Sequence, residues 1–271
     1  MKKIKIIILA AVVLISGCKR VLDLQPTDKI QASQIFGDPK GVKIYMANLY
    51  SQLPIEDFAY MRNGFNWNGA DPNNGGFSAA MATDEAVHSE FGDFVGDGDY
   101  HWWDQGYRLI RDVNLLIDAI PTLPIRDDEK ASLTGESSFI KAYAYFALAK
   151  RYGGVSLIKQ LQVFTGNPED LKVPRSTEKE TWDYVLELCD QAITNLADNN
   201  DTRRANKWIA YALKSRAALH AASIAKFGSR APMSGNAVTA KLVTIDATAA
   251  NGYYQQCIDA SLAIINAGKF S

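Results

Sequence analysis

The chain of 271 residues carries 29 basic and 30 acidic side chains, with 47% hydrophobic and 22% charged residues. This composition is typical of a globular protein with a sizeable core, and the balanced charge argues against nucleic acid or an anionic lipid face as the partner, because both need a basic stripe. Three cysteines without Cys/His ligand spacing argue against a disulfide scaffold and against a zinc site.

The first 17 residues have the pattern of a secretory leader. Lysines are followed by an apolar run, IIILAAVVLI, that is too short to span a bilayer as a helix. The run ends in LISGC, which resembles the bacterial lipobox, whose cysteine is diacylated and then becomes the first residue of the mature chain. We therefore expect residues 1–17 to be removed, Cys18 to carry the lipid, and residues 18–38 to form a tether; the alternative is an incidental buried cysteine. Loss of three leader lysines leaves 26 basic against 30 acidic residues.

The segment from residue 39 predicts a helix followed by a long loop. Asp38 and Pro39 stand where an N-cap and a first-turn proline belong. Apolar side chains then recur at helical spacing, at Val42, Tyr45, Met46 and Leu49. Residues 61–101 are rich in Gly, Asn and Asp, which predicts loop, with one short helix around residues 80–88.

Helices dominate the rest of the chain. We expect helices over 102–120, before Pro121, and over 128–152, before the glycine pair at 153–154. An extended connection then leads to Thr177 and Glu180, which form a capping box. The next two helices each show one apolar face. The first face has Trp182, Val185, Cys189, Ala192, Ile193 and Leu196, and the second has Trp208, Tyr211, Ser215, Ala218, Leu219 and Ala222.

Two helix pairs look like copies of one unit. Residues 142–148 and 210–219 are rich in Ala and Tyr, and each precedes a second helix after a long connection. The offset of about 70 residues is roughly twice the tetratricopeptide period. We predict an all-α fold of tetratricopeptide-like helical repeats with long irregular loop insertions, one of them at 227–252, filling a single helical domain over 39–271.

Five segments occur in a fixed order along the chain. They are the lipobox with LDLQP after it, the pattern of Trp103, Tyr107, Ile110, Asn114 and Ile117, and the stretches 139–155, 175–193 and 253–270. Together they resemble the SusD/RagB family over nearly the whole mature chain. The resemblance implies a tetratricopeptide-type scaffold, anchored by lipid to the outer membrane and facing the cell exterior. It further implies that the protein captures oligosaccharides and delivers them to a SusC-like TonB-dependent transporter.

The resemblance leaves alternatives open. A RagB-type member would bind peptides, and a helical scaffold of a membrane complex would bind protein alone. Family members are much longer, so we interpret this chain as an N-terminal portion. Ser156 stands where the family usually has proline, and Lys19-Arg20 replace the acidic residues often found after the acylated cysteine of surface-exported members.

Aromatic residues near the loop at 61–101 are the candidate ligand contacts. Sugars pack a C–H face on an aromatic ring, while neighbouring amides bond their hydroxyls. Of the adjacent Trp102 and Trp103, the family position makes Trp103 the packing member. The candidates are therefore Trp67, Trp102, Tyr100, Phe65, Asn66 and Asn68. The alternative is that the indoles pack in the core or under the loop and that the asparagines serve turns.

Other reactive groups favour structural roles. Asp93, Asp97 and Asp99 do not have calcium-loop spacing, so a solvated turn is the default. Cys189 and Cys257 are expected to be buried free thiols, although a bond between them stays possible. His88, His101 and His220 show no ligand spacing. No catalytic motif occurs, and no carboxylate pair, Asp84-Glu85 included, stands out, so we expect no enzyme, no metal and no cofactor beyond the lipid.

Overall fold

Helices make up the regular structure of this protein, described by a computed structural model for residues 35–53, 102–200 and 203–270. The α-helices are α3 (Pro39–Ser51), α4 (Trp102–Ala119), α5 (Asp127–Tyr152), α6 (Glu178–Asn195), α7 (Lys207–Phe227), α8 (Asn236–Thr239) and α9 (Ala250–Asn266). Short 3₁₀ helices are η5 (Ile120–Thr122), η6 (Pro168–Leu171), η7 (Gly228–Arg230) and η8 (Ala247–Ala249). The all-α prediction is confirmed, and the leader with Cys18 lies outside the described residues.

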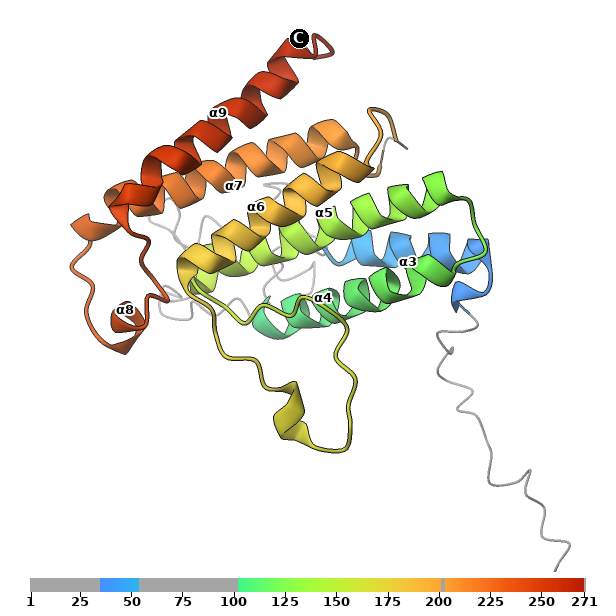
Figure 1. Cartoon of the computed structure of the whole chain (residues 1–271), viewed down its shortest axis with the longest axis horizontal. Coiled ribbons are helices and arrows are strands. Elements are labelled where there is room, and N and C mark those ends of the chain that lie inside the picture. Colours follow the sequence, from blue (N-terminus) through green and yellow to red (C-terminus); the bar gives the residue numbers. More distant parts are fainter. Residues whose placement is uncertain (1–34, 54–101, 201–202, 271) are drawn as a thin grey trace, which may run out of the picture.

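The long helices pack in chain order. Figure 1 shows α4, α5, α6, α7 and α9 one above the other, with α3 beside α4. Each of these helices contacts the next one, as stacked helix pairs of a tetratricopeptide-like array do. Within the described ranges, no helix is both long enough and apolar enough to cross a membrane.

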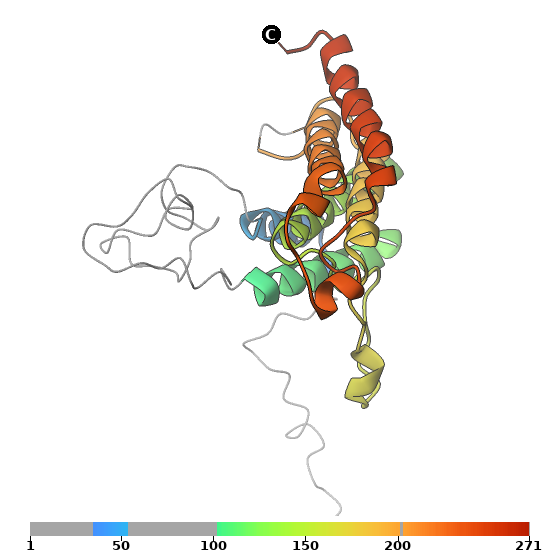
Figure 2. The same cartoon turned by 90° about the vertical axis from the view of Figure 1, so that its left-hand side faces the viewer.

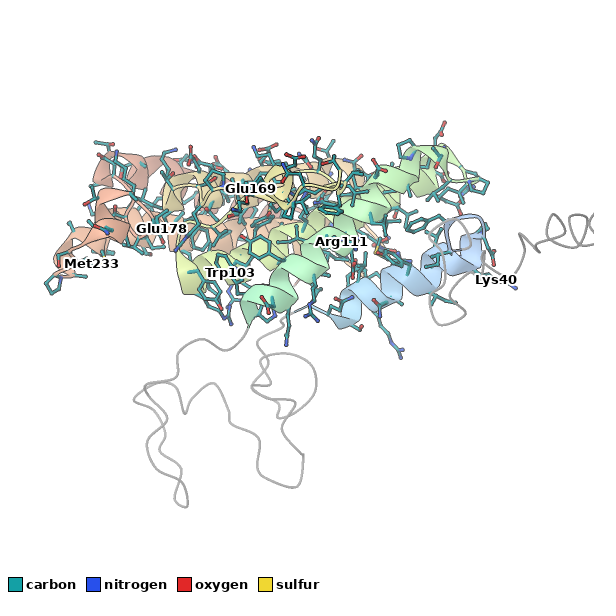
Figure 3. All side chains as sticks on the ribbon, turned by 90° about the horizontal axis from the view of Figure 1, so that it is seen from below. Lys40, Trp103, Arg111, Glu169, Glu178 and Met233 are labelled. Carbon is teal, nitrogen blue, oxygen red and sulfur yellow. The ribbon has the colours of Figure 1, made fainter. Side chains whose placement is uncertain are left out.

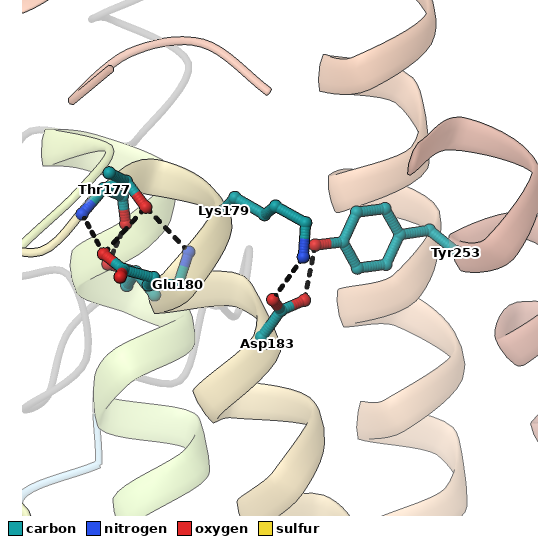
Figure 4. A network of polar contacts seen from close by, with 6 residues as sticks. Thr177, Lys179, Glu180, Asp183 and Tyr253 are labelled. Carbon is teal, nitrogen blue, oxygen red and sulfur yellow. Dashed lines mark hydrogen bonds and ion pairs between the residues drawn. The ribbon is translucent and has the colours of Figure 1, made fainter. Parts of the chain in front are cut away.

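The predicted N-terminal ends of α3 and α6 are confirmed. Asp38 accepts a hydrogen bond from the Lys40 amide, with Pro39 in the first turn, and α3 buries Val42, Met46 and Leu49. At α6, Thr177 and Glu180 form the reciprocal capping box, and the Thr177 amide holds the pKa of the Glu180 carboxyl below its usual value. One turn further, Asp183 accepts from Lys179 at 2.6 Å and from the Tyr253 hydroxyl at 2.5 Å, which ties α6 to α9 (Figure 4).

The centre of the core is an aromatic cluster between α5, α6 and α7. Trp182 is fully buried, and its ring meets Phe146 edge-on at 5.8 Å between centroids. His220 stacks on Trp182 at 5.9 Å, which confirms its structural role. Cys189 is buried and Cys257 is half-buried, and both are free thiols. Burial raises the pKa of the Cys189 thiol, so this group is unreactive at neutral pH.

The apolar face predicted for α7 is partly wrong. Leu219 is 48% exposed, and Trp208, Tyr211 and Ser215 are only half-buried. Ala218 and Ala222 are buried as predicted, but the rest of the face that enters the core consists of Leu213 and four further alanines, Ala210, Ala217, Ala221 and Ala225. Alanines let α7 approach both α6 and α9 closely, so backbone proximity outweighs the burial of larger side chains.

The insertion at 227–252 is irregular, as predicted, but part of it is structural. The Leu242 carbonyl accepts from the Gly154 amide at 2.6 Å, and the Lys241 carbonyl accepts from the Glu178 amide at 2.9 Å. Gly153, at φ +67°, has no room for a Cβ, which would lie 2.1 Å from the Leu242 oxygen. The insertion therefore locks the junction where α5 ends and α6 begins, which explains the glycine pair.

Candidate functional site

The connection between α5 and α6 forms an arm, residues 153–177, that projects from the helix stack with η6 at its far end (Figures 1 and 2). Its base is closed by an antiparallel bridge between Ser156 and Arg175. Arg175 donates to the carbonyls of Gly154 at 2.7 Å and Tyr152 at 2.6 Å. The Ser156 hydroxyl donates to the Val173 carbonyl at 2.7 Å, a bond that proline at this position could not make. The arm is therefore a fixed structure at its base.

A buried polar clamp fastens the arm to α4 and α5. Asn114, 2% exposed, donates to the carbonyls of Ile158 at 3.0 Å and Gln160 at 3.2 Å. Lys141, 1% exposed, donates to the Asn114 side-chain oxygen at 2.6 Å and to the Lys159 carbonyl at 2.7 Å. Burial lowers the pKa of Lys141 to about 8. These two side chains replace water around three arm carbonyls, so the arm runs along α4 at a fixed distance.

Two tyrosines continue the clamp toward the base. The Tyr107 hydroxyl of α4 donates to the Ser156 carbonyl at 2.9 Å, and the Tyr145 hydroxyl of α5 accepts from the Ile158 amide at 2.7 Å. Burial raises the pKa of both phenols, so both stay protonated through the physiological range.

A groove of about 600 Å³ lies between α4 and the arm. From α4 it is lined by Trp103, Asp104, Tyr107, Arg108, Arg111 and Asn114, and from the arm by Ile158, Leu161, Gln162, Phe164 and Leu171. Figure 3 shows Trp103 and Arg111 along the same helix, with the arm residue Glu169 on the neighbouring segment. The groove combines aromatic rings with charged and amide side chains, which is the chemistry that carbohydrate sites use.

Trp103 provides the aromatic end of the groove. Its ring is half-buried and is held by Tyr107 and Tyr152, each 5.0 Å away between centroids, with the Tyr152 ring edge-on. Phe164, on the arm side, is 60% exposed. Two supported rings and one exposed ring make a surface on which a sugar or an aromatic side chain can stack without reorganising the protein.

The assignment of the two adjacent indoles is wrong. Trp102 is 4% exposed, packs over Gly106 and belongs to the core, whereas Trp103 is the indole that reaches the groove. A Cβ on residue 106 would lie 2.7 Å from the Trp102 ring, so this glycine makes room for the indole. The reason is rotational: Trp102 falls on the stripe of α4 that includes Leu109, Val113 and Leu116.

The other predicted contacts lie outside the described residues. These are Tyr100, Phe65, Asn66, Trp67 and Asn68, and they stay predictions, as do the aspartates at 93, 97 and 99. Within the described part, no cluster of three or more metal-binding side chains occurs.

Charge is unevenly distributed along the groove. Arg108 and Arg111 are exposed one turn apart on α4, and Arg111 approaches the Asp112 carboxylate only to 3.9 Å. Arg108 has no ion pair with a carboxylate in the described parts of the chain. Asp104 is the single acidic side chain among the groove residues and lies beside Trp103. Along α4 the groove therefore begins with Trp103 and Asp104 and continues with Tyr107 and the two arginines.

A second hollow of about 590 Å³ lies beside α3 and the start of α5, but its lining has no aromatic ring. Its buried carboxylate, Glu136, is already satisfied by Arg204 at 2.6 Å and by the Tyr50 hydroxyl at 2.8 Å. This network joins α3, α5 and the α6–α7 connection and serves the fold.

The sequence contains two polar residues that belong to the clamp, but helical periodicity alone does not show what they bind. Asn114 and Lys141 each interrupt an apolar helical face, between Val113 and Leu116 and between Ile140 and Ala142. A polar residue on such a face needs a buried partner. The identity of that partner, a set of arm carbonyls, depends on how the connection folds back. The groove arginines gave no signal, because exposed arginines are ordinary on a helix.

Comparison with known proteins decides the family. A SusD-like family model, described as "Starch-binding associating with outer membrane", matches residues 45–219. The chain belongs to the SusD-like family. It is 29% identical over 208 residues to SusD-like protein P38 of Formosa agariphila, covering 72% of this chain and 39% of that protein. A SusD-like protein of Bacteroides ovatus is 26% identical over 111 residues, covering 40% and 20%.

Solved structures of SusD-like proteins share the fold. A SusD-like protein of Bacteroides fragilis is 25% identical, with a TM-score of 0.57, and the match covers 92% of this chain and 42% of that one. A laminarin-binding SusD-like protein is 17% identical, with a TM-score of 0.55, over 69% and 41%. This chain thus spans about two fifths of the first curated relative and of both structures.

Proposed function

We propose that this protein is a lipid-anchored, nutrient-binding protein of the outer membrane. Cys18 would carry the acyl chains and hold the helical domain at the outer face of the cell. The protein would capture oligosaccharides and deliver them to a SusC-like TonB-dependent transporter, and would itself perform no catalysis. Membership of a family described as starch-binding supports the ligand class, and the LISGC leader supports the anchor.

The observation that carries the proposal is the groove with Trp103 at one end. The clamp of Asn114 and Lys141 holds the arm in place, so the rings and polar groups are arranged before the ligand arrives. A pre-arranged site loses little conformational entropy on binding, which suits capture from dilute solution. Aromatic stacking supplies affinity, and Gln162 with the charged groups of α4 supplies hydrogen bonds to hydroxyls.

Native affinity electrophoresis tests this function. The unacylated protein is run through gels that contain starch, laminarin or other polysaccharides, with laminarin included because a protein of the same fold is described as binding it. We expect retardation by at least one glycan, lost in Trp103→Ala and kept in Trp208→Ala, which changes a half-buried indole that packs on Tyr211 and Phe270 and is not among the groove residues. Trp67→Ala tests the loop prediction in the same gels.

Uniform migration in every gel would contradict carbohydrate capture. The peptide-binding and protein-scaffold alternatives would then be examined by co-purification with the membrane complex and by peptide binding. If Trp208→Ala and Trp103→Ala both lose retardation, a general loss of structure is the explanation to test. Circular dichroism of the two variants then shows whether they are still folded.

A further inference from the structure

We infer that the groove between α4 and the arm selects acidic glycans, those that carry carboxylate or sulfate groups. This inference rests on the proposed function and deepens it, because it assigns a charge to the ligand. The observation behind it is the order of the groove residues along α4, where Trp103 comes first and two arginines, Arg108 and Arg111, follow one and two turns later.

The two ends lie a useful distance apart. Trp103 and Arg111 are eight residues apart on one helix, which at about 1.5 Å per residue places their backbones about 12 Å from each other. A ligand must therefore be extended to contact both ends, which favours an oligosaccharide over a single sugar. One ring of such a chain stacks on Trp103, while a residue further along the chain meets the arginines.

The arginines are available for an anion. Arg108 has no carboxylate partner among the described residues, and the Asp112 carboxylate stays 3.9 Å from Arg111, too far for a hydrogen bond. Both side chains are exposed and both line the groove. A guanidinium matches a carboxylate or a sulfate in a forked geometry that a hydroxyl satisfies only in part. Two such groups one turn apart therefore favour a negatively charged sugar.

The negative charge of Asp104 and the positive charges of the two arginines set the direction in which the ligand lies along the groove. Asp104 lies beside Trp103, so the part of the ligand over the indole is expected to be neutral. The arm contributes apolar side chains and the Gln162 amide to the groove, with no acidic group among its lining residues. The acidic residues of the arm, Glu169 and Asp170, are bonded within the arm by Lys172 and by Thr165 and Asn167. The negative groups of the ligand therefore belong at the Arg111 end.

Affinity electrophoresis with matched glycan pairs tests the inference. The pairs are polygalacturonate with its methyl ester, alginate with its propylene glycol ester, and κ-carrageenan with its desulfated form. The mature chain has an excess of acidic residues, so an acidic gel repels it and retardation reports a specific site. We expect at least one acidic glycan to retard the protein and its neutral partner to fail.

Variants test whether the acidic glycan binds at the two arginines of the groove. Their affinities for the acidic oligosaccharide are measured by calorimetry. Arg108→Gln and Arg111→Gln should each weaken binding about tenfold, the size of one charge-assisted hydrogen bond. Arg111→Lys should recover part of the loss, because it keeps the charge without the fork. The control is Arg230→Gln, which changes an exposed arginine of η7 that stacks on the Phe227 ring. This variant should bind as the unmodified protein does. Raising the salt concentration should weaken the unmodified protein more than Arg111→Gln.

The results separate the inference from the proposed function. If neutral glycans alone retard the protein, and Trp103→Ala abolishes this while Arg108→Gln and Arg111→Gln do not, the acidic selection is wrong and carbohydrate capture stands. If no glycan of either kind retards it, both fail. Acidic binding that survives both arginine variants overturns the assignment to this groove.

Discussion

The α4–α5 side of the molecule and the α7–α9 side meet the same requirement with different side chains. Both must fasten a later segment of the chain onto the helix stack: the arm on the first side and α9 on the second. The α4–α5 side buries a lysine and an asparagine, which bind the carbonyls of the arm. The α7–α9 side buries a stripe of alanines and adds small polar contacts, such as Ser215 Oγ with Ser261 Oγ at 2.8 Å.

The difference shows what each kind of packing can support. Alanine packing needs a regular helix on both sides, because it depends on close backbone approach. An irregular arm exposes carbonyls that no helix can satisfy, so it must be met by side-chain donors. The buried Asn114 and Lys141 therefore lie where the chain leaves the repeat, and the groove lies at the same place.

Removing the centre of the clamp should have the largest effect. In Asn114→Leu the carbonyls of Ile158 and Gln160 lose their donor, and the buried Lys141 loses one acceptor. We expect the free energy of unfolding to fall by about 3 kcal/mol, because unpaired buried groups cost more than a bond contributes. Chemical denaturation measures this. Asn48→Leu, at an exposed site on α3, is the matched control and should change it by less than about 0.5 kcal/mol. Equal effects of the two substitutions would mean that the clamp does not fix the arm.

Enlarging one alanine should break the other side. Ala221 is fully buried in α7, so Ala221→Leu inserts atoms where there is no space and should cost about 2 kcal/mol. Ala212→Leu, on the exposed face of the same helix, should be nearly neutral. Thermal unfolding of both variants compares them directly, and a stable Ala221→Leu would indicate that α7 and its neighbours are loosely packed.

The clamp should also give the protein a characteristic pH dependence. The unfolded chain keeps the Lys141 proton up to about pH 10.5, whereas the folded protein releases it near pH 8. Between these values the unfolded chain binds more protons, so the free energy of unfolding rises with pH in this window. Relative to Lys141→Met, we expect the unmodified protein to gain on the order of 1 kcal/mol between pH 7 and 9.5. Parallel pH profiles of the two proteins would show that Lys141 titrates normally.

The smallest expected effect concerns the end of the arm, where α6 begins. Thr177→Ala removes the bond from the Glu180 amide to the Thr177 hydroxyl and should cost about 0.5–1 kcal/mol. Thr194→Ala, whose hydroxyl bonds the Asp190 carbonyl within the helix, should cost less. Thermal denaturation compares the melting temperatures of the two variants. An equal shift would mean that the capping box does not stabilise the junction between the arm and α6.

Much of the fold follows from local rules. Caps at Asp38 and Thr177, the glycine stop at 153–154 and the helical periods predicted α3 to α7 close to their observed bounds. These features act within a few residues, so sequence spacing contains the information. The repeat of helix pairs was also visible, since each pair must bury the same kind of face against its neighbour.

The sequence by itself therefore determined the helices, their order and the family pattern. Tertiary structure alone decided which indole of the pair at 102–103 faces the groove and which stripe of α7 enters the core. It also decided that Asn114 of α4 and Lys141 of α5 bind the arm, which follows α5 and folds back along both helices. The physical reason is that a helical period fixes the spacing of a face but not its rotation toward a partner. That rotation is set by long-range contacts, and the groove is made by them.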